Sequence, residues 1–185
     1  MKFLIINTLL LFSIFSLAGC SQQSLATKEN ETPIQAKEEQ QTTIYYNSVG
    51  DYSESITAEH LKTGILEISK EKNIIHFKIK VAISSDLQTK IHNTKENFYF
   101  NITDVEGKNN LASVLAEPPL FTPCNLNEMR EGNYYVIKQS VTVKKDISSE
   151  KLKKLLLPSN YELQFVAKDK QVVAIIIGLE TNMIN

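Results

Sequence analysis

The sequence is poor in the residues that most often carry chemistry. Its 185 residues include two Cys, three His and no Trp. The 20 basic side chains are 19 Lys and a single Arg, Arg130, and 21 acidic side chains leave a formal net charge of −1. Arginine side chains, which bind phosphate or carboxylate groups through two parallel hydrogen bonds, are therefore nearly absent. A protein that binds a nucleic acid needs a clustered basic surface, and the nearly neutral charge of this chain argues against such a function.

Patterns typical of catalytic or metal sites are missing as well. The sequence contains no Gly-x-Ser-x-Gly, His-Glu-x-x-His, phosphate-loop or dinucleotide-binding motif. His60, His76 and His92 are evenly spaced, but their spacing fits neither one helix face nor one strand, and no close His or Cys cluster occurs. Cys124 has no base among its sequence neighbours that could activate a thiol. We therefore expect no enzyme, no metal and no cofactor.

The one long apolar run lies at the N-terminus, in MKFLIINTLLLFSIFSLAGC. A single positive charge, Lys2, precedes a run from Phe3 to Ala18 that four polar residues interrupt. The run is shorter than the about 20 apolar residues that a spanning helix needs, and it ends in small residues. The sequence therefore predicts a signal peptide over residues 1–19, with a signal anchor, or a secretory signal cleaved at another position, as the alternatives.

The last four residues of this run, Leu17, Ala18, Gly19 and Cys20, resemble the lipobox of bacterial lipoproteins. The resemblance implies that the Cys20 thiol receives a diacylglyceryl group and that cleavage between Gly19 and Cys20 makes Cys20 the first mature residue. It also implies acyl chains such as palmitate and anchoring at the extracellular face of the cell membrane. The Lys-rich composition, with much Asn and Ile, resembles proteins of AT-rich Gram-positive bacteria; Ser21 leaves the outer membrane open in a Gram-negative cell.

Polar chain follows the lipobox at once. Residues 21–43 contain four apolar side chains and show no period of 2 or 3.6. Such a composition cannot bury enough apolar surface to offset the entropy of ordering. We interpret residues 20–43 as a lipidated cysteine followed by a disordered tether. Once Cys20 carries lipid, Cys124 has no partner for an intrachain disulfide.

The period changes to 2 in the remaining chain, residues 44–185, which we expect to form one domain. The clearest segment is Ile74–Ile83, where odd-numbered apolar residues alternate with His76, Lys78 and Lys80. This alternation predicts a strand with one face on a core and the other in water. Further strands are predicted at Gly64–Ser69, Asn97–Thr103, Tyr134–Val143 (with Gln139 as an exception in its apolar row), Asn160–Ala167 and Val172–Leu179.

Two segments near the C-terminus carry additional expectations. Val172–Leu179 is apolar on both faces, which favours a central strand. Ser148–Leu157 is the one segment with helical spacing, because a Ser N-cap precedes its leucines and Pro158 stops it. Seven or eight short strands and one short helix indicate an all-β antiparallel sandwich. The pattern resembles the immunoglobulin-like domains of many Gram-positive lipoproteins; a small open β-barrel is the alternative.

Exposed tyrosines and one long loop are the candidate ligand-binding elements. Tyr99 and Tyr134 lie on the strand faces opposite the predicted core, where tyrosine offers apolar area with a polar tip. The alternative is that a second layer covers these faces. The Pro118–Tyr134 loop adds Phe121 and Asn125, since long structured loops often carry function.

These observations predict a membrane-anchored extracytoplasmic lipoprotein whose β-domain, expected to be a monomer, binds a protein, peptide or envelope ligand. The alternative is an immunity or shielding lipoprotein that intercepts a toxin at the surface. A small hydrolase is disfavoured because no catalytic pattern occurs. A transporter accessory role is disfavoured too, because a solute receptor needs two α/β lobes that this chain is too short to form.

Overall fold

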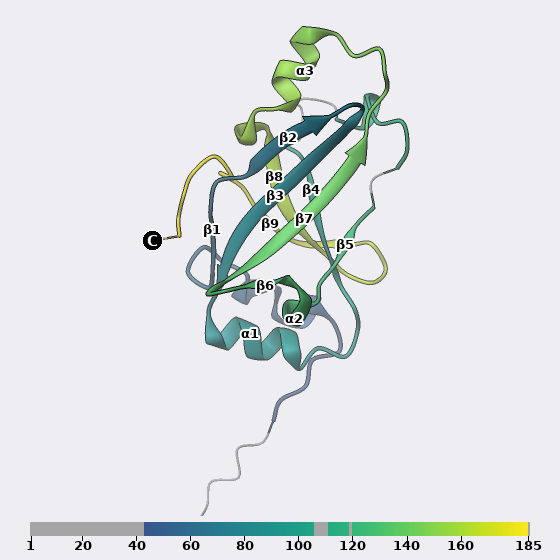
Figure 1. The fold of residues 1–185 in the computed structure, drawn as a ribbon. Coiled ribbons are helices and arrows are strands. Elements are labelled where there is room, and N and C mark those ends of the chain that lie inside the picture. The colour runs from purple at the N-terminus through teal and green to yellow at the C-terminus, as the bar shows by residue number, and fades with distance from the viewer. Residues whose placement is uncertain (1–42, 106–110, 119, 185) are drawn as a thin grey trace, which may run out of the picture. The chain divides into compact units, whose positions relative to one another are not determined.

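The computed structural model describes residues 43–105, 111–118 and 120–184 (Figure 1). The predicted signal peptide, Cys20 and the tether up to residue 42 lie outside the described residues. The described residues form one compact unit.

The described chain forms two antiparallel sheets and no closed barrel, consistent with a β-sandwich. The first sheet has the order β1-β3-β7-β6, with β2 also pairing with β3, and the second has the order β5-β4-β8-β9. The strands of the first sheet are β1 (Leu61–Thr63), β2 (Glu67–Glu71), β3 (Ile74–Ile83), β6 (Arg130–Glu131) and β7 (Tyr134–Thr142). Those of the second are β4 (Tyr99–Asp104), β5 (Thr122–Pro123), β8 (Tyr161–Val166) and β9 (Val172–Ile176).

Several short helices cap the two ends of the sandwich. Figure 1 shows α3 at one end and α1 and α2 at the other. Their bounds are α1 (Ser85–His92), α2 (Leu126–Met129) and α3 (Ser149–Leu155), with 3₁₀ segments η1 (Val49–Ser55), η2 (Leu111–Ser113) and η3 (Pro158–Asn160). The described residues thus contain nine strands and three α-helices, more than the seven or eight strands and one helix predicted.

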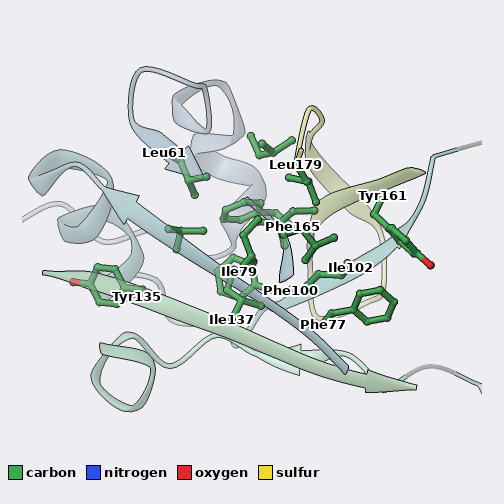
Figure 2. Packing of buried hydrophobic residues seen from close by; sticks show 14 of the residues in the cluster. Leu61, Phe77, Ile79, Phe100, Ile102, Tyr135, Ile137, Tyr161, Phe165 and Leu179 are labelled. Carbon is green, nitrogen blue, oxygen red and sulfur yellow. The ribbon is translucent and has the colours of Figure 1, made fainter. Parts of the chain in front are cut away.

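The core lies between the two sheets. Figure 2 shows Phe77, Ile79 and Ile137 of the first sheet facing Phe100, Ile102 and Phe165 of the second, and all six are fully buried. Burying each such side chain stabilises the fold by about 1.5–3 kcal/mol. The period-2 pattern that predicted β3 is confirmed, because its odd-numbered residues are the buried ones.

Gln139, the polar exception in the apolar row of β7, joins the two sheets along one side. Its side chain is buried, and its Oε1 accepts a hydrogen bond from the Ile102 N–H at 2.7 Å. Its Nε2 donates to the Ile102 carbonyl oxygen at 3.0 Å. Because β5 pairs only with Tyr99 and Phe100, the Gln139 amide takes the place of the next peptide along the edge of β4.

The C-terminal segment joins the sheets along the other side. After β9 the chain leaves the second sheet and runs beside residues 63–66 of the first (Figure 1). The Leu66 N–H donates to the Leu179 carbonyl oxygen at 2.8 Å, and the Met183 N–H donates to the Thr63 carbonyl oxygen at 2.8 Å.

The prediction of a central strand at Val172–Leu179 is wrong. β9 ends at Ile176 and pairs only with β8, so it is an edge strand of the second sheet. Ile175 and Ile177 are 50% and 67% exposed, whereas Ile176 is buried. The continuous apolar run in the sequence therefore belongs to an edge strand in which Ile176 alone is fully buried. The run also includes Leu179, which is buried after the chain has turned at Gly178, where φ is +78°.

The long connection before Tyr134 is more structured than expected. It was interpreted as a loop without a period, but it contains β5, α2 and β6. The helix predicted at Ser148–Leu157 is confirmed as α3, with the Ser148 side chain accepting a hydrogen bond from the Lys151 N–H. After the 3₁₀ segment η2, Leu115 forms an isolated antiparallel bridge with Val143.

Candidate binding site

The outer surface of the first sheet is largely polar, although it includes the buried side chain of Val136 opposite Lys80. Residues of β2, β3 and β7 that point away from the core form two rows across the strands. One row consists of Glu67, Lys78 and Lys138, and the other of Ser69, His76 and Ser140. Together with Lys80 and Tyr134 these six residues are called the basic face below. Most of their side chains are exposed, and those of His76, Lys78 and Tyr134 are half-buried.

Two adjoining hollows lie on the basic face. The first, of about 320 Å³, is lined by both rows: Glu67, Ser69, His76, Lys78, Lys138 and Ser140, with backbone neighbours Ile68 and Phe77. The second, of about 310 Å³, is lined by Gly64, Ile65, Glu67, Lys80, Tyr134, Asn182 and Ile184. Glu67 lines both hollows, so the two lie next to each other on the sheet.

The polar groups of the face are loosely paired. His76 Nδ1 and Ser140 Oγ are hydrogen-bonded at 2.9 Å across β3 and β7. Lys78 lies 3.8 Å from a Glu67 carboxylate oxygen, and Lys138 lies 2.9 Å from one of Glu131. The hydrogen bond from Lys138 lowers the pKa of the Glu131 carboxyl, and the charges of Lys138, Lys78 and Lys80 lower it further. The positive potential of this face therefore extends to β6.

The predicted tyrosines lie on different sheets. Tyr134 lines the second hollow of the basic face, so the predicted position of its side chain, opposite that of buried Tyr135, is confirmed. Tyr99 lies on β4 of the other sheet, with its ring centroid 6.3 Å from that of Phe121. The structure thus brings Tyr99 and Phe121 together.

The Tyr99–Phe121 pair already holds a cation of the protein itself. Lys170 Nζ lies 3.5 Å from the Tyr99 ring centroid and 4.7 Å from that of Phe121. Such cation–π contacts stabilise the turn between β8 and β9 by about 0.5–1 kcal/mol at an exposed site. Asn125 has a local role as well, because its side chain accepts a hydrogen bond from the Asn127 N–H at 3.2 Å and caps α2.

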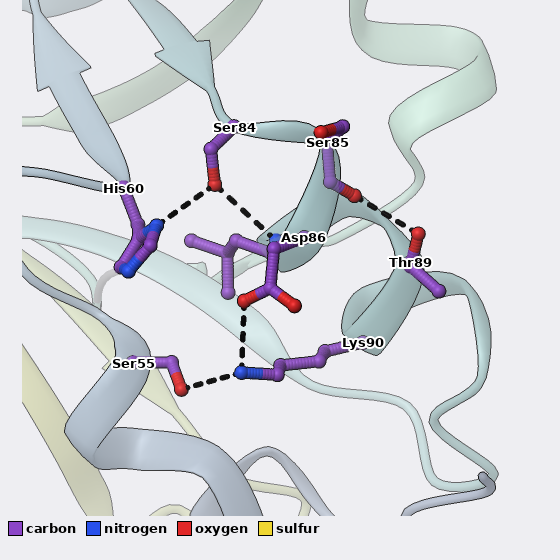
Figure 3. A network of polar contacts seen from close by, with 8 residues as sticks. Ser55, His60, Ser84, Ser85, Asp86, Thr89 and Lys90 are labelled. Carbon is purple, nitrogen blue, oxygen red and sulfur yellow. Dashed lines mark hydrogen bonds and ion pairs between the residues drawn. The ribbon is translucent and has the colours of Figure 1, made fainter.

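A serine, a histidine and an aspartate meet near the start of α1 (Figure 3). Ser84 is the N-cap of α1, its Oγ accepting a hydrogen bond from the Leu87 N–H, and it is also hydrogen-bonded to His60 Nδ1 at 3.1 Å. Asp86, however, is paired with Lys90 at 2.9 Å, and Lys90 also donates to Ser55 at 2.8 Å. The cluster joins α1 to η1 and to the residues before β1, and its carboxylate orients a lysine instead of the histidine.

Cys124 lies in an unreactive environment. Its side chain packs against the core, and burial raises the pKa of the thiol to about 12. A thiol with so high a pKa is not a nucleophile near neutral pH. Among the residues that the structure describes, no three His, Cys, Asp or Glu side chains gather as a metal site would require.

Comparison of the chain with family models, curated proteins and solved structures found no match. No helix within the described ranges is long and apolar enough to cross a membrane.

Of the residues of the basic face, sequence reasoning singled out Tyr134 alone as a candidate for ligand binding. The alternation of His76, Lys78 and Lys80 with apolar residues indicated a solvated face of β3. It missed that Glu67, Ser69, Lys138 and Ser140 are neighbours on that face, because cross-strand neighbours depend on pairing and register. The sole available signal was that Lys138 and Ser140 alternate with the apolar residues of their own segment.

Proposed function

We propose that this protein is a membrane-anchored extracytoplasmic lipoprotein whose β-domain binds a protein, peptide or envelope ligand without catalysis. Residues 1–19 act as the signal peptide, residues 20–43 as the lipidated cysteine and tether, and residues 44–185 as the binding domain. The diacylglyceryl group on Cys20 holds the protein at the extracellular face of the cell membrane. The resemblance of residues Leu17 to Cys20 to a lipobox supports this membrane location.

We further propose that the domain is immunoglobulin-like. In that fold one sheet has the strand order A-B-E-D and the other C-F-G, with an added C′ beside C in some members. The orders here, β1-β3-β7-β6 and β5-β4-β8-β9, follow this scheme when the strands are assigned in chain order. On this assignment β3 and β7 correspond to B and E, and β8 and β9 to F and G.

A tyrosine at the start of β8 supports the same assignment. Immunoglobulin-like domains often carry a tyrosine near the start of strand F whose hydroxyl bonds to the backbone a few residues upstream. Tyr161 is fully buried, and its hydroxyl donates a hydrogen bond to the Leu155 carbonyl oxygen at 2.7 Å. The position two residues later, a cysteine in antibody domains, is the fully buried Leu163.

The observation that carries the binding proposal is the basic face. A five-stranded sheet has one side on the core and the other largely polar, with two adjoining hollows that include Tyr134. Hollows lined by ammonium, imidazole, hydroxyl and phenol groups can form hydrogen bonds and ion pairs with a ligand. The absence of catalysis is supported by the high pKa of the Cys124 thiol and by the pairing of Asp86 with Lys90.

Partner recovery from intact cells tests the proposal. Cells would display the protein with residues 22–42 replaced by a Gly/Ser chain of equal length, or with Tyr134→Ala and Lys80→Ala combined, at matched surface levels. The tether exchange should preserve partner capture because both tethers are flexible coils of equal reach. The double substitution should weaken capture. Loss of capture on exchanging the tether, together with normal capture by the double variant, would place recognition in the wrong segment.

A further inference from the structure

We infer that the basic face binds a phosphate-bearing chain, an inference that rests on the proposed function and names its ligand class. Three ammonium groups line the two hollows, those of Lys78, Lys80 and Lys138, against the single carboxylate of Glu67. The whole chain has a net charge of −1, so this local excess of positive charge does not reflect the overall composition.

The positions of the lysines favour the binding of an anion. Lys78 and Lys138 are directly opposite each other on β3 and β7. Like charges in directly opposite positions destabilise a sheet. Their carboxylate partners, Glu67 and Glu131, are at least half exposed on their side chains, and exposed ion pairs contribute about 0–1 kcal/mol. An anion lying between the two ammonium groups would relieve their repulsion and could displace these weak pairs.

The second row supplies neutral donors beside the charges. Ser69, His76 and Ser140 lie in one row across β2, β3 and β7, next to the row that contains Lys78 and Lys138. All five side chains line the same hollow. A group that enters it would therefore meet two ammonium groups, two hydroxyls and an imidazole from several directions.

This donor set fits a phosphate better than a carboxylate. Planar carboxylates are matched by the fork of arginine, whereas lysine acts as a point charge and is a common phosphate ligand. The single arginine, Arg130, lies on β6 and lines neither hollow. A tetrahedral phosphate can accept from lysine, serine and histidine donors that converge from different directions.

The arrangement of the hollows indicates a chain with more than one phosphate. Lys78 and Lys80 project from the same side of β3 and are two residues apart, a step of about 7 Å along the strand. Lys78 lines the first hollow and Lys80 the second. Successive phosphates of an extended chain can thus be held in the two hollows at once, which a lone phosphate cannot exploit.

Binding of inorganic polyphosphate to the full-length protein in detergent tests this inference. The association constant would be measured at several salt concentrations for the wild type and for Lys78→Gln combined with Lys138→Gln. The matched control is Lys145→Gln combined with Lys153→Gln, which removes the same charge from two exposed positions. Poly-L-glutamate serves as the comparison ligand, and thermal unfolding confirms that all variants are folded.

We expect the wild type and the control to bind polyphosphate, with affinity that falls as salt rises. The double variant on the face should bind at least tenfold more weakly, and the slope of log K against log salt should fall by about 0.7 for each lysine lost. The imidazole resonances of His76 should shift on addition of polyphosphate.

Three results would overturn the inference. Equal weakening in the control variant would mean attraction by net charge without a site, and no polyphosphate binding by the wild type would remove the ligand class. Equal or tighter binding of poly-L-glutamate would make an acidic protein segment the ligand; the proposed function would then stand while the phosphate inference fails. The proposed function is tested separately by the tether exchange on intact cells, because the result of that experiment does not depend on the chemical class of the ligand.

Discussion

Single polar side chains decide how the two sheets are joined. Gln139 occupies a position in β7 where the sequence pattern calls for an apolar residue, and it is buried there. Its amide satisfies both backbone groups of Ile102 in the other sheet. A buried peptide group without a hydrogen-bond partner costs about 1–3 kcal/mol. A polar residue is therefore needed at position 139, because its side chain pairs with the backbone groups at the edge of β4.

Replacing this amide should destabilise the domain. Gln139→Leu leaves the Ile102 N–H and carbonyl oxygen buried without partners, and we expect a loss of about 2–4 kcal/mol in the free energy of unfolding. Gln171→Leu is the control, because Gln171 is exposed, and it should change stability by less than about 0.5 kcal/mol. Chemical denaturation measures both. Equal stability of the two variants would show that Gln139 does not join the sheets.

A second buried polar residue has the opposite effect. Thr63 on β1 is fully buried, and within the described residues its hydroxyl has no hydrogen-bond partner. Thr63→Val keeps the shape and removes the unpaired hydroxyl, so we expect the free energy of unfolding to rise by about 1 kcal/mol. Thermal and denaturant unfolding test this directly. A destabilised Thr63→Val variant would mean that the hydroxyl finds a partner, such as a bound water.

At the scale of the elements, β9 illustrates the limit of pattern reasoning. An apolar run can belong to a central strand or to an edge strand whose outer face is uncovered, and local sequence does not distinguish the two. The difference is set by what pairs with the strand. Here β9 follows β8 and no described strand lies beyond it, so its outward isoleucines stay exposed.

Adjacent isoleucines of β9 should respond very differently to truncation. Ile176 is 7% exposed, so Ile176→Ala removes buried methyl groups and should cost about 2–4 kcal/mol. Ile175 is 50% exposed, and Ile175→Ala should cost less than about 1 kcal/mol. The midpoints of urea unfolding compare them. Similar costs for both variants would indicate that another chain covers the outer face of β9.

Strands whose apolar residues alternate with polar ones were predictable from the sequence, and short capped helices were less so. Local alternation was enough to locate β3 with its observed bounds and to place most of β7 and β8. By contrast, α1 was missed although Ser84 caps it and Leu87 and Ile91 lie one turn apart on its buried face. Eight residues give a weak helical period, and this helix forms because its apolar face packs on the core.

The candidate site was predictable to a similar extent. The solvated side of each strand could be identified one strand at a time, which correctly placed Tyr134 and Lys80 away from the core. The solvated sides of β3 and β7 form one surface because these two strands pair, although they are separated by about 50 residues in the chain. Non-local pairing of this kind is decided by the whole core, so the basic face emerges only in the folded domain.

At the scale of the whole molecule, the anchor depends on one thiol. Cys20→Ser removes the nucleophile that the lipobox resemblance assigns to diacylglyceryl transfer. We expect the variant protein to leave the membrane fraction and to be found in the medium or as an unprocessed precursor. Fractionation followed by mass spectrometry of the N-terminal peptide measures both effects. Unchanged processing and unchanged membrane association of the variant would refute the lipoprotein assignment.

The most direct test of the central claim, that the basic face is the ligand-binding surface, is photo-crosslinking on intact cells. A photoreactive amino acid would replace Lys80 on the basic face or, as the control, exposed Lys153 on α3. We expect adducts from position 80 that are reduced when Lys78→Gln and Lys138→Gln are combined, and only background from position 153. Adducts from position 153 with none from position 80 would contradict the claim.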